Sequence, residues 1–225
     1  MKGIFVTGTD TEVGKTFVSA LLMRSLRSVT KVRYWKPIQT GIEVDDDTAT
    51  VKRLARCFDN EIHDAGFRLE KPWSPHVSAR MAGIDIQVCD ILNHLPGDDD
   101  DDVFWIVEGA GGVLVPLNDS ETILDLIEVL TLPTVVVTRS SLGTINHTLL
   151  TLEALRGRDI PIAGVVMNRG SNTSNKSAIE QFGKVKVLAE VPDLSDPLVD
   201  TVGEWLKAQA SRFHELVPRK IGAIA

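Results

Sequence analysis

A glycine-bounded loop near the start of the chain holds the residues with the clearest chemistry. It runs from Gly8 to Thr16 and reads GTDTEVGKT. A strand-like run precedes it and a helical pattern follows, a setting in which backbone N–H groups and a helix N-terminus bind phosphate. In such a loop Lys15 can bridge the β- and γ-phosphates of a nucleoside triphosphate, and the Thr16 hydroxyl can bind Mg²⁺. The sequence therefore predicts a site for Mg²⁺ and a triphosphate, with ATP as the first choice.

The loop departs from the usual spacing. Phosphate loops of this kind have four residues between their two glycines. Here five residues separate Gly8 from Gly14, and Thr9 stands where the first glycine is usual. A chance Gly-Lys-Thr at a helix start is the alternative, but the order of strand, loop and helix favours the phosphate loop.

An acidic residue in a second glycine-rich stretch is a candidate metal ligand. Glu108 follows the apolar run Phe104–Val107 and precedes Gly-Ala-Gly-Gly. A carboxylate at the carboxyl end of a strand lies at the edge where open α/β sheets bind ligands, so it can hold Mg²⁺ against the phosphates. Glycines there let the backbone approach the ligand closely. A plain strand-ending turn is the alternative, for which one glycine suffices.

Two further candidates are weaker on spacing alone. Asp45-Asp46-Asp47 precedes a helical pattern, so a helix cap with surface charge is favoured over a magnesium ligand. Lys36 ends an apolar strand-like run. A strand-end lysine is usually solvated, but at the ligand edge of such a sheet it can stabilise a transferring phosphoryl group.

Strand-like and helical patterns alternate along the chain. We expect strands over 3–7, 32–35, 104–107, 133–138, 162–167 and 185–191, and helices over 16–27, 47–57, 123–130 and 144–156, with a final helix capped by Asp196 with Pro197 in its first turn. This order predicts an α/β fold of three layers, like that of P-loop NTPases, with a mainly parallel central sheet flanked by helices. We expect a single domain over 1–225, with 66–102 as its most irregular part and its Asp98–Asp102 run as a solvated loop rather than a metal site.

Composition excludes several classes of function. The formal net charge is −7 and no basic face is evident, so nucleic acid is not an expected partner. Cys57 and Cys89 form no CxxC pair, which argues against a disulfide framework or a zinc site. Without an apolar run of about 20 residues or a signal-like start, we expect no membrane association and a cytoplasmic protein.

Taken together, these segments resemble the dethiobiotin synthetases, the ligases that form the ureido ring in biotin biosynthesis. The matching pieces run in order from residue 3 to about residue 192, and they are Gly8–Thr16, Lys36-Pro37 with Thr40-Gly41, Ser74-Pro75-His76, Val107–Gly112 with Val115-Pro116-Leu117, Leu142–His147, Asn168 and Val191-Pro192. The resemblance implies that ATP and CO₂ convert 7,8-diaminopelargonate to dethiobiotin. One amine would form a carbamate, ATP would phosphorylate it to a carbamic-phosphoric anhydride, and the second amine would close the ring.

The resemblance also implies roles for particular residues. Nucleotide-binding residues would be Glu12, Val13, Gly14, Lys15, Thr16, Phe17, Glu108, Gly109, Ala110, Gly111, Asn168, Arg169, Pro192, Asp193 and Leu194, with Asn168 reading the base edge. Substrate-binding residues would be Thr11, Lys36, Thr40, Gly143, Thr144, Ile145 and Asn146, the last four opening a helix that holds the substrate carboxylate across a homodimer interface. Lys15, Lys36 and Thr11 would be catalytic, and Thr16, Asp47 and Glu108 would hold Mg²⁺.

Several assignments stay open at this point. Asp46 is the alternative to Asp47, and either Asp200 or Glu204 could be the acid that the family places near the base. His147 is expected to be packed rather than catalytic.

Three other functions are alternatives to that of a synthetase. A partitioning or positioning ATPase would carry a second lysine five residues before Lys15, where this chain has Asp10. A cobyric-acid-synthase-like synthetase domain would usually need a glutaminase domain with a catalytic cysteine, and neither cysteine here lies in a nucleophile motif. A nucleotide-binding subunit without activity is disfavoured because Lys15, Thr16, Lys36 and Glu108 are all present.

Overall fold

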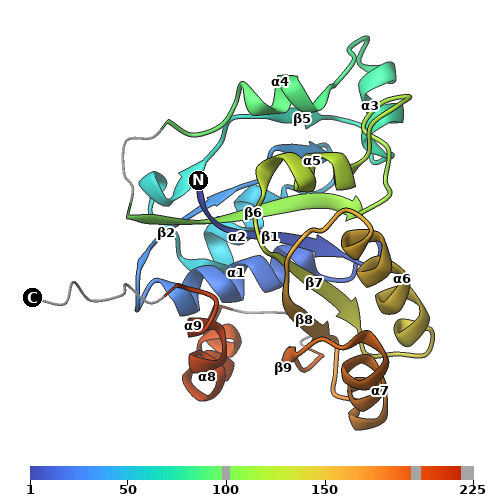
Figure 1. Ribbon diagram of the computed structural model, residues 1–225. Helices are drawn as coiled ribbons and strands as arrows, with labels where there is room; N and C mark the ends of the chain where they lie inside the picture. The colour runs from blue at the N-terminus through green and yellow to red at the C-terminus, as the bar shows by residue number, and fades with distance from the viewer. Residues whose placement is uncertain (98–101, 194–198, 219–225) are drawn as a thin grey trace, which may run out of the picture.

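A parallel β-sheet forms the centre of the molecule. In the computed structural model, which describes residues 1–97, 102–193 and 199–218, the strand order is β4-β2-β6-β1-β7-β8-β9, and neighbouring strands pair in parallel. Helices cover both faces of this sheet (Figure 1). The predicted three-layer α/β fold is therefore confirmed.

The elements follow one another in the order that the sequence patterns predict, with additions. The strands are β1 (Lys2–Gly8), β2 (Lys31–Trp35), β3 (Ile38–Thr40), β4 (Ile62–His63), β5 (Phe67–Leu69), β6 (Val103–Gly112), β7 (Thr134–Arg139), β8 (Ile162–Asn168) and β9 (Val187–Glu190). The helices are α1 (Lys15–Leu26), α2 (Asp47–Ala55), the 3₁₀ turn η1 (Asp59–Glu61), α3 (Pro75–Met81), α4 (Val88–Leu92), α5 (Ile123–Leu130), α6 (Thr144–Arg156), α7 (Thr173–Gly183), α8 (Val199–Gln209) and α9 (Ser211–His214). Strands β3 and β5 form a separate two-stranded sheet.

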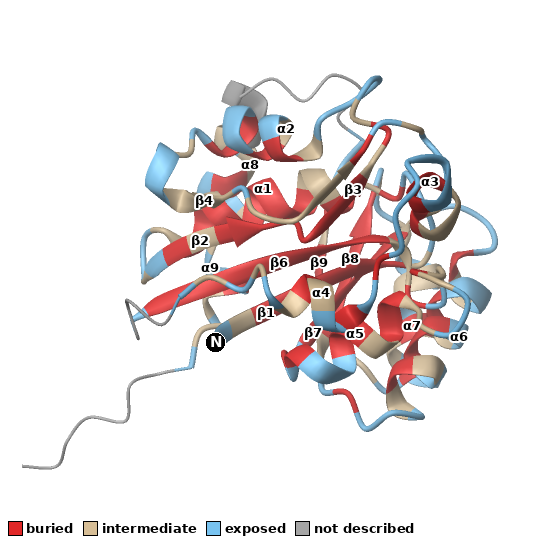
Figure 2. Ribbon diagram, turned by 90° about the horizontal axis from the view of Figure 1, so that it is seen from above, coloured by how far each residue is buried: buried red, intermediate tan, exposed pale blue. Residues whose placement is uncertain are grey.

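Two hydrophobic cores lie on opposite faces of the central sheet. Alternate strand residues point to opposite faces, so Phe5 packs into one core while Ile4 and Val6 pack into the other. The first core includes side chains of α3 to α7, and the second includes those of α1, α2, α8 and α9. In Figure 2 the buried strands run between helices whose outer surfaces are exposed.

The same alternation places functional side chains on one face of the sheet. Phe104 and Ile106 of β6 belong to the core beneath α1, and Glu108 continues that series. Tyr34 of β2 belongs to the same core, and Lys36 lies two residues further on. Since parallel strands all end at one edge of the sheet, these side chains gather beside the first turn of α1.

The structure corrects the expectation for 66–102. This region was predicted to be irregular, but its described part contains β5, α3 and α4. Helix α3 begins with Pro75 at its first position, where a missing N–H is tolerated. Helices α3 and α4 have only seven and five residues, which is too short to show a helical repeat in the sequence. Residues 98–101 of the acidic run lie outside the described residues.

Three other expectations need revision. Strand β6 was predicted to end at Val107 but continues to Gly112, because it still pairs with β1 at Val6–Glu108 and, after a shift of register, at Gly8–Gly112. Helix α7 was not predicted. The final helix is described from Val199 and is interrupted at Ala210, while its expected cap, Asp196, and Pro197 lie outside the described residues.

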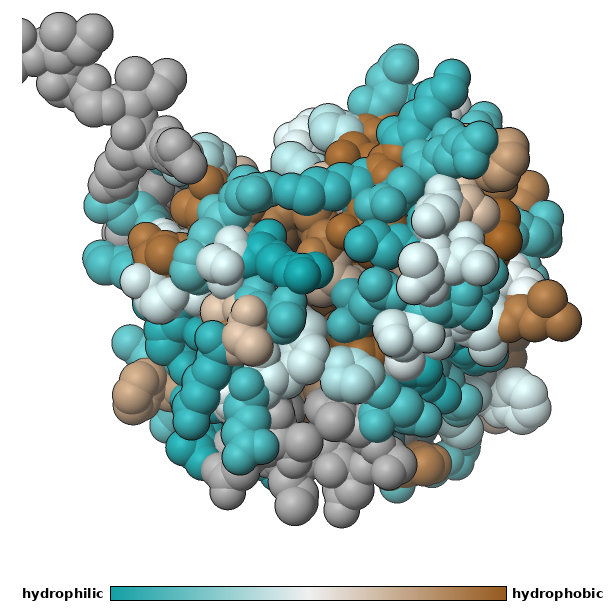
Figure 3. Space-filling model, turned by 90° about the horizontal axis from the view of Figure 1, so that it is seen from below, coloured by the Kyte–Doolittle hydropathy of each residue, from teal (hydrophilic) through white to brown (hydrophobic). Residues whose placement is uncertain are grey.

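The surface in Figure 3 is mostly hydrophilic, with hydrophobic side chains in separate groups. Among the described residues, no helix is both long enough and apolar enough to span a bilayer.

Candidate active site

The phosphate loop connects β1 to α1 through unusual backbone conformations. Gly14 precedes α1 with φ of 94°, and Glu12 has φ of 57°. Lys15 is buried, and its Nζ donates to the carbonyl of Asp10 at 3.0 Å. Burial, followed by the nearby charge of Lys36, lowers the pKa of Lys15 to about 8. Such a group has a strong electrostatic preference for a negative partner, which a triphosphate would supply.

A hydroxyl and two carboxylates meet at the first turn of α1. Thr16 Oγ1 lies 2.5 Å from Asp47 Oδ1 and 3.0 Å from Glu108 Oε1. Glu108 is fully buried in β6, whereas the Asp47 side chain is 28% exposed at the start of α2. These are the hard oxygen ligands that Mg²⁺ prefers.

Lys36 joins the two carboxylates. Its Nζ lies 2.8 Å from Asp47 Oδ2 and 2.8 Å from Glu108 Oε1. Burial by itself lowers the pKa of Lys36, but the two negative charges outweigh it and raise that pKa above its ordinary value. For Asp47, burial is the largest single effect and raises the pKa, but Lys36, Thr16 and Lys15 together lower it below its ordinary value. The pair therefore stays charged, and the Lys36 ammonium is fixed at the ligand edge of the sheet.

Tyr34 is a functional residue that the sequence analysis missed. Its buried hydroxyl donates to Glu108 Oε2 at 2.9 Å. Burial, and then the charge of Glu108, raises the pKa of Tyr34 well above its ordinary value, so the hydroxyl keeps its proton and orients the carboxylate. The signal was its spacing of two from Lys36, because alternate residues of an extended chain point to the same face, and Lys36 directly follows β2.

Two residues of the aspartate triplet, Asp46 and Asp47, make different contacts. Asp46 is the N-cap of α2 and its Oδ1 accepts from the Ala49 N–H at 3.0 Å, while Gln39 Nε2 lies 3.4 Å away. Asp47 instead points to Thr16 and Lys36. The helix cap favoured for the triplet is thus confirmed at Asp46, whereas the magnesium role of Asp47 stays a prediction.

Asn168 lies against the phosphate loop. Its Nδ2 donates to the Val13 carbonyl at 2.9 Å, and the side chain is buried at the end of β8. A Cβ at Gly14 would lie 2.0 Å from that Nδ2. Asn168 therefore supports the loop, a role that sequence reasoning did not assign to it. Its predicted contact with the base stays a prediction.

An open groove of about 530 Å³ runs along the outer side of the phosphate loop. The residues that line it are Thr9, Asp10, Thr11, Gly112, Val113, Leu114, Val115, Pro116, His147, Leu150 and Thr151. One wall thus belongs to the loop and the stretch after β6, and the other to α6. A small molecule in this groove would lie beside the phosphate end of a nucleotide.

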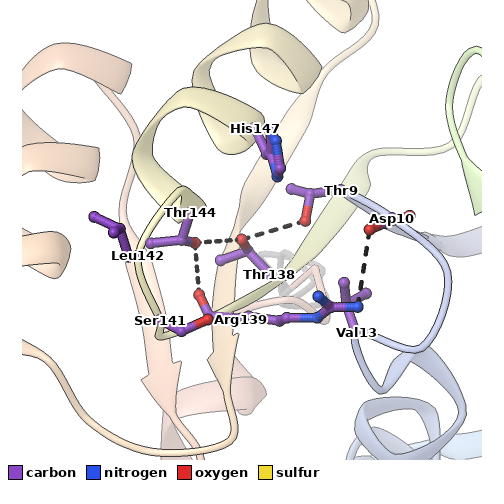
Figure 4. A pocket seen from close by; sticks show the side chains of 9 residues that line it. All are labelled: Thr9, Asp10, Val13, Thr138, Arg139, Ser141, Leu142, Thr144 and His147. Carbon is purple, nitrogen blue, oxygen red and sulfur yellow. Dashed lines mark hydrogen bonds and ion pairs between the residues drawn. The ribbon is translucent and has the colours of Figure 1, made fainter.

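A smaller cavity of about 50 Å³ lies between the loop and the start of α6 (Figure 4). Here Arg139 Nη2 donates to the Thr11 carbonyl at 3.1 Å and lies 3.8 Å from Asp10 Oδ2. Asp10 Oδ1 also accepts from the Thr11 N–H at 2.7 Å. At the position where partitioning ATPases carry a lysine, this chain therefore has an acid that binds its own loop.

Comparison with known proteins identifies the family. A family model described as an AAA domain matches residues 2–198. An ATP-dependent dethiobiotin synthetase of Paramagnetospirillum magneticum is 50% identical over 194 residues, which cover 86% of this chain and 89% of that protein. The chain belongs to the dethiobiotin synthetase family. Within this family, a synthetase of Brucella abortus is 43% identical over 193 residues, which cover 86% of this chain and 87% of that protein.

The solved structures that resemble this member of the family share its fold at low sequence identity. The cell division ATPase MinD of Pyrococcus furiosus superposes with a TM-score of 0.61 at 17% identity, covering 96% of this chain and 98% of that one. The septum site-determining protein MinD of Pyrococcus horikoshii gives 0.60 at 16% identity, covering 99% and 98%. At such identity the likeness shows a P-loop NTPase fold and does not favour a switch ATPase over a synthetase.

Other positions that the resemblance singled out make few side-chain contacts in the described structure. Phe17 packs partly buried beside the core under α1, and Thr40 ends β3. Asn146, Arg169, Pro192 and Asp193 are exposed. Leu194 and the side chain of Asp200 lie outside the described part of the structure. Glu204 is exposed on α8.

The start of α6 matches its predicted position. Gly143 is the N-cap with φ of 93°, and the Thr144 side chain is buried and turned away from the surface. Ile145 packs partly buried against the core above the sheet. The expectation for His147 was wrong, because its side chain is exposed and lines both the groove and the small cavity.

The aspartate pair gives a matched test of the magnesium ligand. We expect Asp47→Asn to lower turnover by about 10- to 100-fold and to raise the Mg²⁺ concentration needed for half-maximal rate, because a hydrogen bond to a charged group contributes about 1.5–3 kcal/mol. Asp46→Asn should change little, since asparagine caps a helix as well as aspartate. Rates measured across a Mg²⁺ titration check this, and a larger defect in the Asp46 variant would reverse the assignment.

Substitutions at two glycines with positive φ distinguish the effect of backbone strain from the effect of a clash with Asn168. Gly83 has φ of 71° and open space for a Cβ, whereas a Cβ at Gly14 meets Asn168. We expect Gly83→Ala to lower the free energy of unfolding by about 1 kcal/mol from strain alone. Gly14→Ala should lower it further and weaken ATP binding at least tenfold. Equal losses in urea unfolding, with ATP affinity unchanged, would contradict the role given to Asn168.

Proposed function

We propose that this chain catalyses ATP-dependent closure of a ureido ring on 7,8-diaminopelargonate with CO₂, giving dethiobiotin, ADP and phosphate. The observation that carries the proposal is the shared wall of the groove. Thr9, Asp10 and Thr11 belong to the phosphate loop and also line the 530 Å³ space that could hold a small molecule. In this geometry an acceptor and the γ-phosphate would meet without domain movement.

The reaction needs a carbamate, a phosphoryl transfer and a ring closure. One amine of the substrate adds to CO₂ and loses a proton, which gives the carbamate. A carbamate oxygen attacks the γ-phosphorus of ATP and ADP leaves, which gives the mixed anhydride. The second amine then attacks the carbamate carbon, the ring closes and phosphate leaves. Every step places negative charge near the phosphate loop, so fixed cations are the main requirement.

The residues of the chain would meet this requirement as follows. The N–H groups from Glu12 to Phe17 and the Lys15 ammonium would hold the triphosphate. Lys36, fixed by its two carboxylates, would stabilise the carbamate and the transferring phosphoryl group. Thr11, on the groove wall, would contact the diamine or its carbamate. Thr40 would bind the same substrate.

The donor set at the start of α1 fits a magnesium ion. Thr16, Asp47 and Glu108 would hold it, since one hydroxyl and two carboxylates leave room for the phosphate oxygens and waters that Mg²⁺ usually keeps. Among the described residues no group of three acidic, histidine or cysteine side chains offers another metal site. When bound, the ion would neutralise charge on the β- and γ-phosphates.

We also propose a homodimer in which α6 of one subunit serves the substrate of the other. The N-terminus of α6, from Gly143 to Asn146, would hold the substrate carboxylate through its backbone N–H groups. Support comes from three leucines around the groove and the small cavity: Leu114, Leu142 and Leu150 are 64%, 103% and 61% exposed. Exposed apolar side chains gathered at one place are typical of an interface.

The base of the nucleotide would lie beyond β8 and β9. Asn168 ends β8 and Arg169 follows it, while Pro192 and Asp193 follow β9, so these residues would border the base. The Asn168 Oδ1 would remain for the base while its Nδ2 supports the loop.

Isotope transfer tests the proposed reaction. The purified protein is incubated with ATP, Mg²⁺, the diamine and ¹³C-bicarbonate, and the product is analysed by mass spectrometry and carbon NMR. We expect the label at the ureido carbon of dethiobiotin. Formation of a product without the label, or of no product by folded protein, would reject the proposal.

A further inference from the structure

A chain of threonine hydroxyls connects the phosphate loop to α6. Thr9 donates to Thr138 Oγ1 at 3.3 Å, and Thr148 donates to the same oxygen at 3.0 Å. The hydroxyls of Thr138 and Thr144 are 2.6 Å apart. Figure 4 shows Thr138, near the end of β7, between Thr9 of the loop and Thr144 of the helix.

The direction of the hydrogen bonds in this chain follows from counting protons. Thr144 has one hydroxyl proton, and it donates to the Arg139 carbonyl at 2.5 Å. The proton between Thr138 and Thr144 must therefore belong to Thr138. Thr138 then accepts two hydrogen bonds and donates one, which is the full capacity of a hydroxyl. The Thr138 side chain is completely buried, so its hydroxyl depends on these protein partners.

The chain of threonine hydroxyls joins the two walls of the groove. Thr9 lines the groove from the phosphate loop, and His147 and Thr151 line it from α6. Thr138 lines the small cavity and not the groove, and it binds one residue of the loop and two residues of α6. The side chain of Thr9, at the place where phosphate loops usually have glycine, supplies the loop's hydroxyl for this contact.

We infer that Thr138 is a positioning residue that fixes the phosphate loop relative to α6 and so sets where the substrate lies against the triphosphate. This inference rests on the proposed function. In the proposed function the N–H groups of the loop would hold the nucleotide, whereas the shape of the groove depends on the distance between the loop and the helix. Loss of the Thr138 hydroxyl should therefore impair use of the diamine more than use of ATP.

Valine and serine substitutions on β7 test the inference, with dethiobiotin formation as the assay. Thr138→Val keeps the shape and removes the hydroxyl. We expect kcat/KM for the diamine to fall about tenfold, as for a lost buried hydrogen bond of about 1.4 kcal/mol, while KM for ATP changes less than twofold. Thr138→Ser should restore most of the activity. The control is Thr134→Val, which removes another buried hydroxyl of β7 whose partner is the nearby Leu132 carbonyl, and it should leave both constants unchanged.

A second variant keeps the test decisive if Thr138→Val folds poorly. Thr9→Val removes the outer end of the chain at a half-buried position, and it should give the same selective loss. The double variant should be no worse than Thr138→Val alone, because the hydroxyls act together. Equal loss for ATP and diamine, no rescue by serine, or a Thr138→Val enzyme equal to Thr134→Val would overturn the inference. A wild-type protein that forms no dethiobiotin would instead reject the proposed function.

Discussion

Lys36→Ala is expected to lower turnover by about 10²- to 10³-fold while ATP binding changes by less than a few fold. Lys36 Nζ is held 2.8 Å from each of two carboxylates and is 3% exposed, so its charge is fixed before substrate arrives. Removing one such fixed group that faces developing charge has an effect of this size on other enzymes. Because the interaction strengthens in the transition state, the loss should appear in kcat rather than in the affinity for ATP.

A surface lysine provides the matched control for Lys36. Lys52 lies on α2, is 49% exposed, and pairs with Asp59 at 2.6 Å. Lys52→Ala should leave turnover within twofold, since exposed ion pairs contribute little. ATP affinity is measured by calorimetry and kcat by ADP release. An unchanged kcat in Lys36→Ala would remove this residue from the mechanism.

Glu108→Gln is expected to lower turnover by about 10²-fold and to lower the free energy of unfolding by about 2 kcal/mol. The carboxylate is fully buried and accepts from Tyr34, Thr16 and Lys36. Neutralising it leaves Asp47 as the one negatively charged partner of Lys36 in the site, and removal of one member of a buried ion pair is strongly destabilising. Burial lowers the pKa of Lys36 and the charges of Glu108 and Asp47 raise it, so this pKa should fall in the variant.

Glu61, which forms an ion pair outside the site, provides a control that distinguishes a loss of stability from a loss of catalysis. Glu61 is 13% exposed and binds Arg27 at 2.7 and 2.8 Å. Glu61→Gln should also lower the free energy of unfolding, measured in urea, but it should leave the Mg²⁺ dependence of turnover unchanged. If both variants lost stability and turnover in the same proportion, Glu108 would be only a structural residue.

The sequence predicted the elements whose pattern repeats over many residues. The apolar strands β1, β7 and β8 and the helices α1 and α6 appear within a few residues of their expected bounds, because burial on both sides of a parallel sheet leaves a continuous apolar run. The phosphate loop was readable because its glycines, Lys15 and Thr16 have fixed spacing. Short elements such as α4, with five residues, carry no such repeat and were missed.

The contacts of the site depended on the packing of distant segments. Asp46 and Asp47 look equivalent in the sequence, and only the direction of α2 turns one to its own helix and the other to Thr16. Tyr34 reaches Glu108 across 74 residues, and Asn168 reaches Val13 across 155. His147 seemed to be a packed residue, but its place on α6 beside the groove exposes it. Such long-range pairs follow from strand order, which the sequence patterns do not specify.

The most direct test of the central claim is the stoichiometry of ADP release. Purified protein is given ATP, Mg²⁺ and bicarbonate, with and without 7,8-diaminopelargonate, and ADP and dethiobiotin are measured in the same samples. We predict that ADP release depends on the diamine and equals the dethiobiotin formed, mole for mole. ADP release at the same rate without the diamine, and with no dethiobiotin, would contradict the synthetase assignment and indicate a switch-type ATPase.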